Sequence, residues 1–413
     1  MKDPKQTAPS QDRRSFLCTS AWVAIGAGLG YSLTPMGPME SVALAVPKTP
    51  FRIAGKHPDL RILNTRPVNA ETPAHLLHET ITSTSRLFVR NNGIPPSLDS
   101  AEAWTLNIGG EAVKTPVRFT LAELKARFTH YSYQLVLECA GNGRAEFHPP
   151  ARGNQWTTGA VGCVKWTGIR LRDLLAQCNL TKNAVYVAYE GADKHLSGAT
   201  DKRPISRGVP LQKALEDQCL VAWALNDQPI PLLHGHPLRL VIPGYPGSCS
   251  GKWLQTLLVR DRIHDGAKMN GKAYRVPCKP VAPGQQIEDS EMCIIEAMPT
   301  KSLITYPRSG ISHPPGTKLA VRGHAWSGRA DIAAVHISTD YGQTWQPTVL
   351  TKAPNAFAWQ QFAAEVPSLS PGYYEIWARA TDTQGQTQPM ILPGWNPKGY
   401  VNNACHRVAL RVT

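Results

Sequence analysis

A change of hydrophobic pattern near residue 285 constrains the fold of this chain more than any other feature of its sequence. Before a Pro-rich stretch at 277–284, short apolar runs mix with segments of helical spacing, and beyond about residue 290 apolar and polar residues alternate. The first region predicts the strands Tyr133–Cys139, Ala184–Tyr189 and Leu238–Ile242 and the helices Leu121–Phe128 and Leu171–Cys178. We therefore expect an α+β domain over residues 86–284.

The region after the linker, residues 285–413, has the pattern of an all-β domain. Its alternating segments are Val335–Ser338, Ala356–Phe362 and Tyr373–Ala380. Turn residues such as Pro371-Gly372 separate these segments. Several short alternating strands in one region are typical of an immunoglobulin-like β-sandwich. A chain of 413 residues is long enough for two such cores.

Residues 1–45 contain the parts of an export signal. Arg13-Arg14 and Phe16-Leu17 precede an apolar stretch at 21–34, and Ala43-Leu44-Ala45 supplies small residues for cleavage. Paired arginines before Phe-Leu predict the twin-arginine route and a periplasmic protein, with no membrane attachment after cleavage. The alternative is a transmembrane anchor, for which the apolar stretch is short of about 20 residues. Residues 46–85 show no strong periodicity, and we expect an extended arm there.

Charge and cysteine content narrow the classes of partner and cofactor. The net charge of +14 favours an anionic substrate or an acidic partner. Nucleic acid is not expected, because the basic residues are scattered and no basic run is interleaved with aromatic residues. None of the nine cysteines forms a CxxC pair, and Asn402 lies where a c-type haem motif ending at His406 requires cysteine. We expect mostly buried free thiols, and no particular disulfide is predicted.

Cys139 is the residue most suggestive of chemistry. It ends a predicted buried strand and is followed by Ala-Gly-Asn-Gly-Arg, whose small residues let a bulky group approach the backbone. Arg144 favours the ionised thiol, and a thiolate is a ligand for soft metal centres. On these residues alone, an inert buried cysteine is the open alternative.

The sequence around Cys139 resembles the sulfite oxidase family of molybdopterin enzymes. The family motifs are matched, in the same order, by Phe88–Asn91 (FVRN), Cys139–Arg144 (CAGNGR), 156–175 (WTTGAVGCVKWTGIRLRDLL), His234–Gly244 (HGHPLRLVIPG), Lys252-Trp253, and Trp395-Asn396 with His406–Val408. The resemblance covers roughly residues 65–413 and implies a molybdopterin-binding domain followed by a dimerisation domain of immunoglobulin-like type.

The resemblance implies a role for each matched position. Cys139 would supply the protein thiolate to molybdenum. The cofactor-binding residues would be Phe88, Val89, Arg90, Asn91, Asn92, Asp193, His234, Arg239, Ser250, Gly251 and Lys252. The substrate pocket would use Arg90, Arg144, Trp156, Tyr274 and Lys398, with Arg152 at its mouth. Converging cations with Trp and Tyr donors suit a small oxyanion.

The implied function is oxidation of sulfite to sulfate by a molybdenum–molybdopterin cofactor. The chain contains no haem motif, so electrons would pass to a separate periplasmic c-type cytochrome, and the C-terminal domain implies a homodimer. Two positions depart from the family, since Asn92 replaces a histidine and Lys398 an arginine. These changes keep open a sulfane dehydrogenase acting on protein-bound persulfide. A reductase of oxidised methionine would lack the C-terminal domain, and the alternative from another class is a non-enzymatic periplasmic binding protein.

Overall fold

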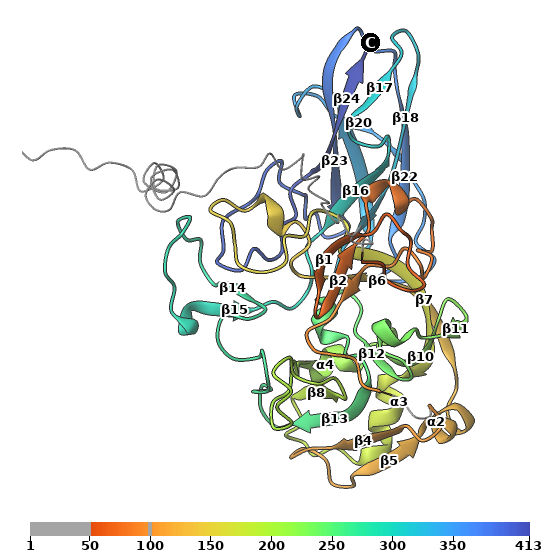
Figure 1. Ribbon diagram of the computed structural model, residues 1–413, viewed down its shortest axis with the longest axis vertical. Helices are drawn as coiled ribbons and strands as arrows, with labels where there is room; N and C mark the ends of the chain where they lie inside the picture. The colour runs from red at the N-terminus through yellow and green to blue at the C-terminus, as the bar shows by residue number, and fades with distance from the viewer. Residues whose placement is uncertain (1–50, 98–100) are drawn as a thin grey trace, which may run out of the picture. The chain divides into compact units, whose positions relative to one another are not determined.

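The computed structural model describes residues 51–97 and 101–413, and Phe51–Thr413 form one compact unit. The predicted export signal at 1–45 lies outside the described residues. Within the described ranges, no helix is long and apolar enough to cross a membrane. Strands dominate and the helices are short (Figure 1). The prediction of an α+β domain followed by a β-sandwich is confirmed.

The segment 46–85, for which the sequence predicts an extended arm, is instead folded where the structure describes it. Strands β1 (Arg61–Thr65) and β2 (Val68–Glu71) form an antiparallel hairpin, and β2 pairs with β3 (Val89–Arg90). A 3-10 helix, η1 (Ala74–Leu76), follows β2. Most residues of β1 are only partly buried, so its sequence carries no clear alternation.

The strand that leads to Cys139 belongs to an antiparallel sheet of order β11-β10-β7-β6, with β12 also paired to β10. Its strands are β6 (Tyr131–Glu138), β7 (Val161–Arg170), β10 (Leu220–Leu225), β11 (Gln228–Pro229) and β12 (Arg239–Val241). Leu135 and Leu137 of β6 pack with Val164 and Trp166 of β7 in a buried cluster. The near-continuous apolar runs of β6 and β7 reflect this burial.

A second sheet has the order β5-β4-β13-β8-β9. Its strands are β4 (Thr105–Gly109), β5 (Val117–Thr120), β8 (Tyr186–Gly191), β9 (Gly208–Pro210) and β13 (Leu254–Arg260). Only the pairing of β13 with β4 is parallel. This sheet contributes Leu106, Val187 and Leu257 to the largest buried cluster, which Leu174 of α3 also joins.

The helices are short and lie between strands. Besides η1, the described residues form α2 (Leu121–Arg127), α3 (Leu171–Leu175), α4 (Leu211–Ala214), η2 (Arg144–Glu146), η3 (Ala176–Cys178), η4 (Leu232–His234), η5 (Gly247–Cys249) and η6 (Asp289–Glu291). Helix α2 begins at a capping box, in which the Thr120 side chain accepts from Glu123 N and Glu123 accepts from Thr120 N. Helix α3 continues into η3, as the predicted helix at 171–178 requires.

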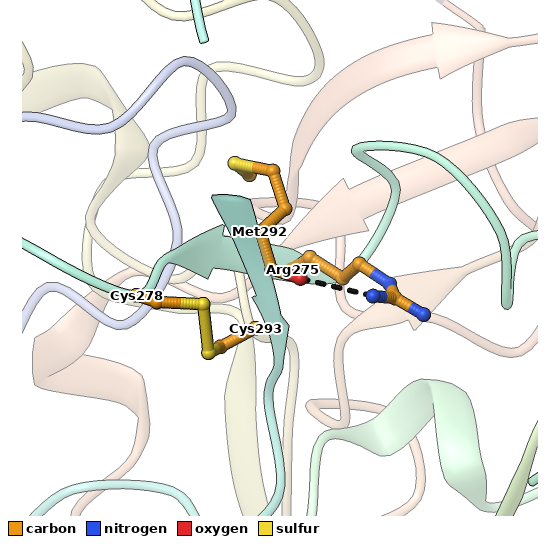
Figure 2. Close-up of a disulfide and its surroundings, with 4 residues drawn as sticks. All are labelled: Arg275, Cys278, Met292 and Cys293. Carbon is orange, nitrogen blue, oxygen red and sulfur yellow. Dashed lines mark hydrogen bonds between the residues drawn. A yellow bond between two sulfur atoms is a disulfide. The ribbon is translucent and has the colours of Figure 1, made fainter. Parts of the chain in front are cut away.

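In the sequence, a disulfide-closed hairpin connects the first domain to the second. Strands β14 (Arg275–Pro277) and β15 (Met292–Ile294) pair antiparallel, and Cys278 is bonded to Cys293 with a Cα–Cα distance of 5.1 Å. Figure 2 shows this bond at the end of the hairpin, with Arg275 donating to the Met292 carbonyl oxygen at 2.9 Å. The predicted domain boundary at 284–285 falls in the loop of this hairpin. The spacing of the cysteines in the sequence did not show which of them form a disulfide. The pairing of β14 with β15 brings Cys278 close to Cys293.

The other cysteines that the structure describes are free. Cys139, Cys163, Cys178, Cys219, Cys249 and Cys405 are all buried. Burial raises the pKa of Cys163 and Cys219 to about 12, so these two thiols stay protonated. The expectation of mostly buried free thiols is therefore confirmed.

The C-terminal domain is a sandwich of two sheets (Figure 1). The first sheet contains β16 (Lys301–Tyr306), β18 (Leu319–Trp326), β22 (Gln360–Val366) and β21 (Val349–Leu350). The second sheet contains β17 (Ile311–His313), β24 (His406–Val412), β23 (Gly372–Asp382), β19 (Ile332–Ser338) and β20 (Gln346–Pro347). Alternate residues such as Val321, Val335, Ile376 and Leu410 fill the core between them.

One predicted strand of the sandwich, Ala356–Phe362, begins later than its sequence pattern indicates. Strand β22 starts at Gln360 because the residues before it contact β6 instead. The Asn355 side chain bonds both backbone groups of Gln134, at 3.0 and 2.8 Å, and Val136 N donates to Phe357 O at 2.9 Å. Apolar residues before Gln360 therefore join the two domains rather than extend the strand.

Candidate active site

Cys139 lies in a tight turn directly after β6. Its backbone N donates to Ala160 O and its carbonyl oxygen accepts from Asn142 N, both at 2.9 Å. The Asn142 side chain donates to Glu138 Oε1 at 3.0 Å and accepts from Ala160 N at 3.1 Å. Gly143 has a φ of 92°, a conformation that favours glycine. The small residues after Cys139 are thus needed to turn the chain away from the thiol.

Cys139 forms part of the wall of a cavity. The cavity is lined by Phe88, Arg90, Asn91, Asn92, Leu137, Cys139, Ala140, Tyr189, Asp193, Ile205, His234, Arg239, Gly247, Ser248, Ser250, Lys252, Trp253 and Tyr274. The fold thereby brings together most of the residues that the resemblance assigns to the cofactor, from segments spread between Phe88 and Lys252.

Two of the predicted cofactor-binding residues lie behind the cavity wall. Val89 is buried in β3 opposite Ala70. Gly251 packs against the Tyr189 ring, and a Cβ there would lie 2.3 Å from a ring carbon. Its carbonyl oxygen accepts from Leu240 N at 2.8 Å. Glycine at 251 therefore lets Tyr189 approach the loop that carries Ser250 and Lys252.

Asn92, one of the two departures from the family pattern, accepts hydrogen bonds from three side chains. Its Oδ1 accepts from Lys268 Nζ at 2.7 Å, from Arg90 Nη2 at 2.9 Å and from Tyr274 Oη at 3.4 Å. A carbonyl oxygen has two lone pairs and can serve several donors, whereas an imidazole nitrogen has one. The amide at position 92 thus holds two cations and the tyrosine hydroxyl around one point of the cavity wall.

Positive charge dominates the remainder of the cavity. Burial and the neighbouring Arg239 and Arg90 lower the pKa of Lys252 well below its ordinary range, and burial lowers the pKa of Arg239 to about 10. Asp193 is the one carboxylate among the lining residues, and burial raises its pKa to about 6. Clustered, desolvated cations with so little opposite charge are stabilised by an anion in the cavity.

These residues fit a large anionic cofactor. Arg239 Nε is buried without a hydrogen-bond partner anywhere in the described chain, so it has a donor to offer. Among the described residues, no group of three or more His, Cys, Asp or Glu could hold a metal ion. A metal beside Cys139 would therefore take most of its ligands from a bound organic group, as a dithiolene cofactor supplies.

The predicted substrate residues are divided by the structure. Arg90 and Tyr274 line the cavity with Cys139, whereas Arg144, Trp156 and Lys398 do not. Arg144 donates to Lys398 O at 2.6 Å and to Asn154 O at 2.9 Å. Its guanidinium group thus donates to backbone carbonyls and also contacts the Tyr400 ring.

Trp156 and the two remaining cations lie at different depths. Trp156 is fully buried and packs edge-on against Phe88, with ring centroids 6.3 Å apart. Its Nε1 has no partner within the described ranges, so this donor is free to meet a bound group. Lys398 is half-buried and Arg152 is exposed. Neither residue lines the cavity, so the position of Arg152 at its mouth stays a prediction.

Four side chains form a column beside the cavity. The Arg207 guanidinium lies 4.6 Å from the Tyr274 ring, Tyr274 stacks on Tyr400 at 5.6 Å with an interplanar angle of 9°, and Arg144 lies 5.0 Å from the Tyr400 ring. Tyr274 has a φ of 54°, which is uncommon for a residue with a Cβ. Stacking between the Arg207 guanidinium and the Tyr400 ring holds the Tyr274 ring in place despite this backbone conformation.

The hairpin described above holds the backbone of Tyr274. Strand β14 starts at the next residue, and Ile295 N, just after β15, donates to Tyr274 O at 3.2 Å. Arg275 also donates to Met269 O at 2.9 Å. The disulfide-closed hairpin therefore fixes the backbone position from which the Tyr274 hydroxyl enters the cavity.

Several residues near the cavity were not found from the sequence. Lys56, Lys268, Arg207 and Ser248 lie outside the matched motifs, and single basic or polar residues give no signal by spacing. Ser248 lines the cavity, and its Oγ accepts from Arg207 Nη1 at 3.2 Å. Tyr400 lies two residues after Lys398, and this proximity is the one signal that could have found it.

Two family models match the chain. Residues 92–268 match the oxidoreductase molybdopterin binding domain, and residues 292–413 match the Mo-co oxidoreductase dimerisation domain. Sulfite oxidase from Gallus gallus is 32% identical over 394 residues, covering 91% of this chain and 83% of that protein. Mitochondrial sulfite oxidase from Homo sapiens is 32% identical over 378 residues, covering 87% and 67%.

A solved structure has the same fold over nearly the whole described chain. The sulfane dehydrogenase SoxCD from Paracoccus pantotrophus has a TM-score of 0.71 and 26% identity, covering 89% of this chain and 95% of that chain. The family models and relatives indicate a molybdopterin cofactor, for which the cationic cavity beside Cys139 is suited. The chain belongs to the sulfite oxidase family of molybdopterin-dependent oxidoreductases.

Proposed function

We propose that this protein oxidises sulfite to sulfate and passes the electrons to a separate c-type cytochrome. The observation that carries the proposal is the cavity itself, in which the Cys139 thiol shares a wall with Arg90 and Tyr274. The overall reaction takes sulfite and water to sulfate, two protons and two electrons. The molybdenum cofactor, when bound through Cys139, supplies the two-electron redox centre, and the electrons leave singly to two ferric cytochromes.

The protein's own contribution is to bind and orient the anion. Arg90 and Lys268 converge on Asn92, where the Tyr274 hydroxyl also lies. Charged N–H donors and a phenol O–H in a buried wall suit a dianion that changes little in size during oxidation. Phe88 lines the cavity with an apolar ring, and the buried Trp156 packs behind that ring.

A sulfane dehydrogenase acting on protein-bound persulfide is the second candidate. Its support is the likeness to the SoxCD structure and the presence of Lys398 where sulfite oxidases carry arginine. Lysine keeps the charge but loses the two-pronged geometry that fits an oxyanion.

Steady-state assays of the cofactor-loaded protein separate the two candidates. Reduction of cytochrome c is followed with sulfite and, separately, with a carrier protein bearing a persulfide. We expect turnover with sulfite and none with the carrier, and the reverse result assigns the protein to the second candidate. Turnover with neither, in protein holding about one molybdenum per chain, would refute both. A Cys139→Ser variant that kept molybdenum and full activity would overturn the ligand assignment.

We further propose that the protein is exported by the twin-arginine route and works in the periplasm as a homodimer. The support is the Arg13-Arg14 motif and the match to a dimerisation domain, together with a molybdopterin cofactor whose size would require folding and loading before export. An Arg13→Lys, Arg14→Lys variant should stay in the cytoplasm on cell fractionation, and light scattering should give twice the chain mass. Unchanged export of the variant, or a monomer, would contradict the respective proposal.

A further inference from the structure

Lys56 lies in the N-terminal segment before β1 and reaches a residue of the cofactor cavity from behind. Its Nζ donates to Thr84 O at 2.6 Å and to Leu87 O at 2.8 Å, and it lies 2.5 Å from His234 Nε2. Lys56 is not among the lining residues of the cavity, whereas His234 is. The three contacts use the full donor capacity of an ammonium group.

These contacts determine where His234 carries its hydrogen. Burial lowers the pKa of Lys56 to about 7, so Lys56 is an ammonium group below that pH. In this form the two carbonyl oxygens, which can only accept, take two of the Nζ hydrogens, and the third is directed at His234 Nε2. Nε2 then acts as an acceptor, and the hydrogen of the neutral imidazole lies on Nδ1. Burial and the neighbouring Lys56 lower the pKa of His234 well below its ordinary range, which keeps the ring neutral.

The backbone of His234 is held independently. Three successive carbonyls of η4 accept from side chains: Leu232 O from Trp253 Nε1 at 2.9 Å, Leu233 O from Lys252 Nζ at 2.6 Å, and His234 O from Arg239 Nη1 at 2.9 Å. The main chain thus cannot shift to let the ring turn. What remains to be fixed is the tautomer of the imidazole, and Lys56 is the residue that contacts it.

We propose that Lys56 is a positioning residue of the cofactor site, which fixes His234 as a neutral Nδ1–H donor for the anionic end of the cofactor. A donor of fixed tautomer beside Arg239 and Lys252 adds a directed hydrogen bond to their charge. The inference rests on cofactor binding and not on the choice of substrate. Either outcome of the comparison between sulfite and persulfide leaves it standing.

The test compares Lys56→Met with Lys182→Met, which removes an exposed lysine of the same size. Full-length proteins are produced in a host that makes the cofactor. Molybdenum and released pterin per chain are measured, together with the rate of pterin loss in buffer. We expect Lys56→Met to lose pterin roughly tenfold faster than the control, the lower end of what outer-layer partners of a metal site contribute. Equal retention in the two variants would overturn the proposal.

Two further measurements separate positioning from a general structural effect. Nitrogen-15 NMR of labelled histidines, recorded below pH 7 where Lys56 is protonated and with His234→Gln to assign the signal, should show Nδ1–H in the wild type and a mixed tautomer in Lys56→Met. An unchanged tautomer with faster pterin loss would refute the mechanism. In a His234→Gln background, Lys56→Met should add no further loss, and additive losses would also refute it. If Lys56→Met does not fold, Lys56→Gln is measured by the same criteria.

Discussion

Glu138→Gln should destabilise the protein far more than its small change in shape suggests. Glu138 immediately precedes Cys139 and is 2% exposed. Its Oε1 accepts from Lys301 Nζ at 2.6 Å, and its Oε2 accepts from Trp326 Nε1 at 2.9 Å. Lys301 begins β16 and Trp326 ends β18, so one buried carboxylate joins the strand of Cys139 to the C-terminal sandwich.

The size of the effect follows from the burial of both charges. Glutamine removes the counter-charge of Lys301, whose side chain is 6% exposed, and leaves an ammonium group in a dry interior. Removing one partner of a buried ion pair costs about 3–5 kcal/mol. This is a large part of the roughly 5–15 kcal/mol by which a folded domain is stable.

Equilibrium urea unfolding of Glu138→Gln, Lys301→Met and the double variant measures this energy. Each single change should lose about 3–5 kcal/mol, and the double variant should lose much less than the sum because no charge is left buried. The matched control is the exposed pair Lys318–Glu365, which has the same N–O distance of 2.6 Å, and Glu365→Gln should have no measurable effect. A loss below about 1 kcal/mol in Glu138→Gln, or additive single losses, would refute the reasoning.

Three further changes have defined outcomes. Tyr400→Leu removes the ring stacked on Tyr274 and should lower kcat/KM roughly three- to tenfold. Tyr400→Phe keeps the ring and should leave kcat/KM unchanged. Cys278→Ser opens a disulfide that spans 15 residues and should lower the free energy of unfolding by about 3 kcal/mol, measured with urea against the oxidised wild type. Burial lowers the pKa of His406 to about 4, so the unfolded chain binds a proton that the native state excludes. The free energy of unfolding should therefore fall as the pH drops from 6.5 towards 4, and less steeply in His406→Gln.

Each of these outcomes has a result that would contradict it. Equal kcat/KM in the leucine and phenylalanine variants would show that the stack does not hold Tyr274. A Cys278→Ser variant as stable as the wild type would mean that the hairpin is closed equally well without the bond. For His406, the same pH slope in both proteins would assign the acid sensitivity to other groups.

Local pattern predicted the elements and the position of Cys139. Periodicities that depend only on nearby residues were enough to predict several elements. These are the strand before Cys139, the helices near residues 121 and 171, and the alternating strand β23. The same reasoning failed at 46–85 and at Ala356, where the chain pairs with distant segments. A contact with β6 from Asn355 leaves no trace in local spacing.

Residue pattern alone was enough to predict two domains of different character, a thiol at a strand end and the motifs of a molybdopterin enzyme. Which side chains face the cofactor cavity, and which lie behind it, became clear from the packing of the folded chain. Arg144 turned out to bond backbone carbonyls, while Lys56, Arg207 and Tyr400 joined the site from outside the matched motifs. The physical reason is that these contacts join residues far apart in the chain, and such contacts depend on how whole sheets pack rather than on the neighbours of any one residue.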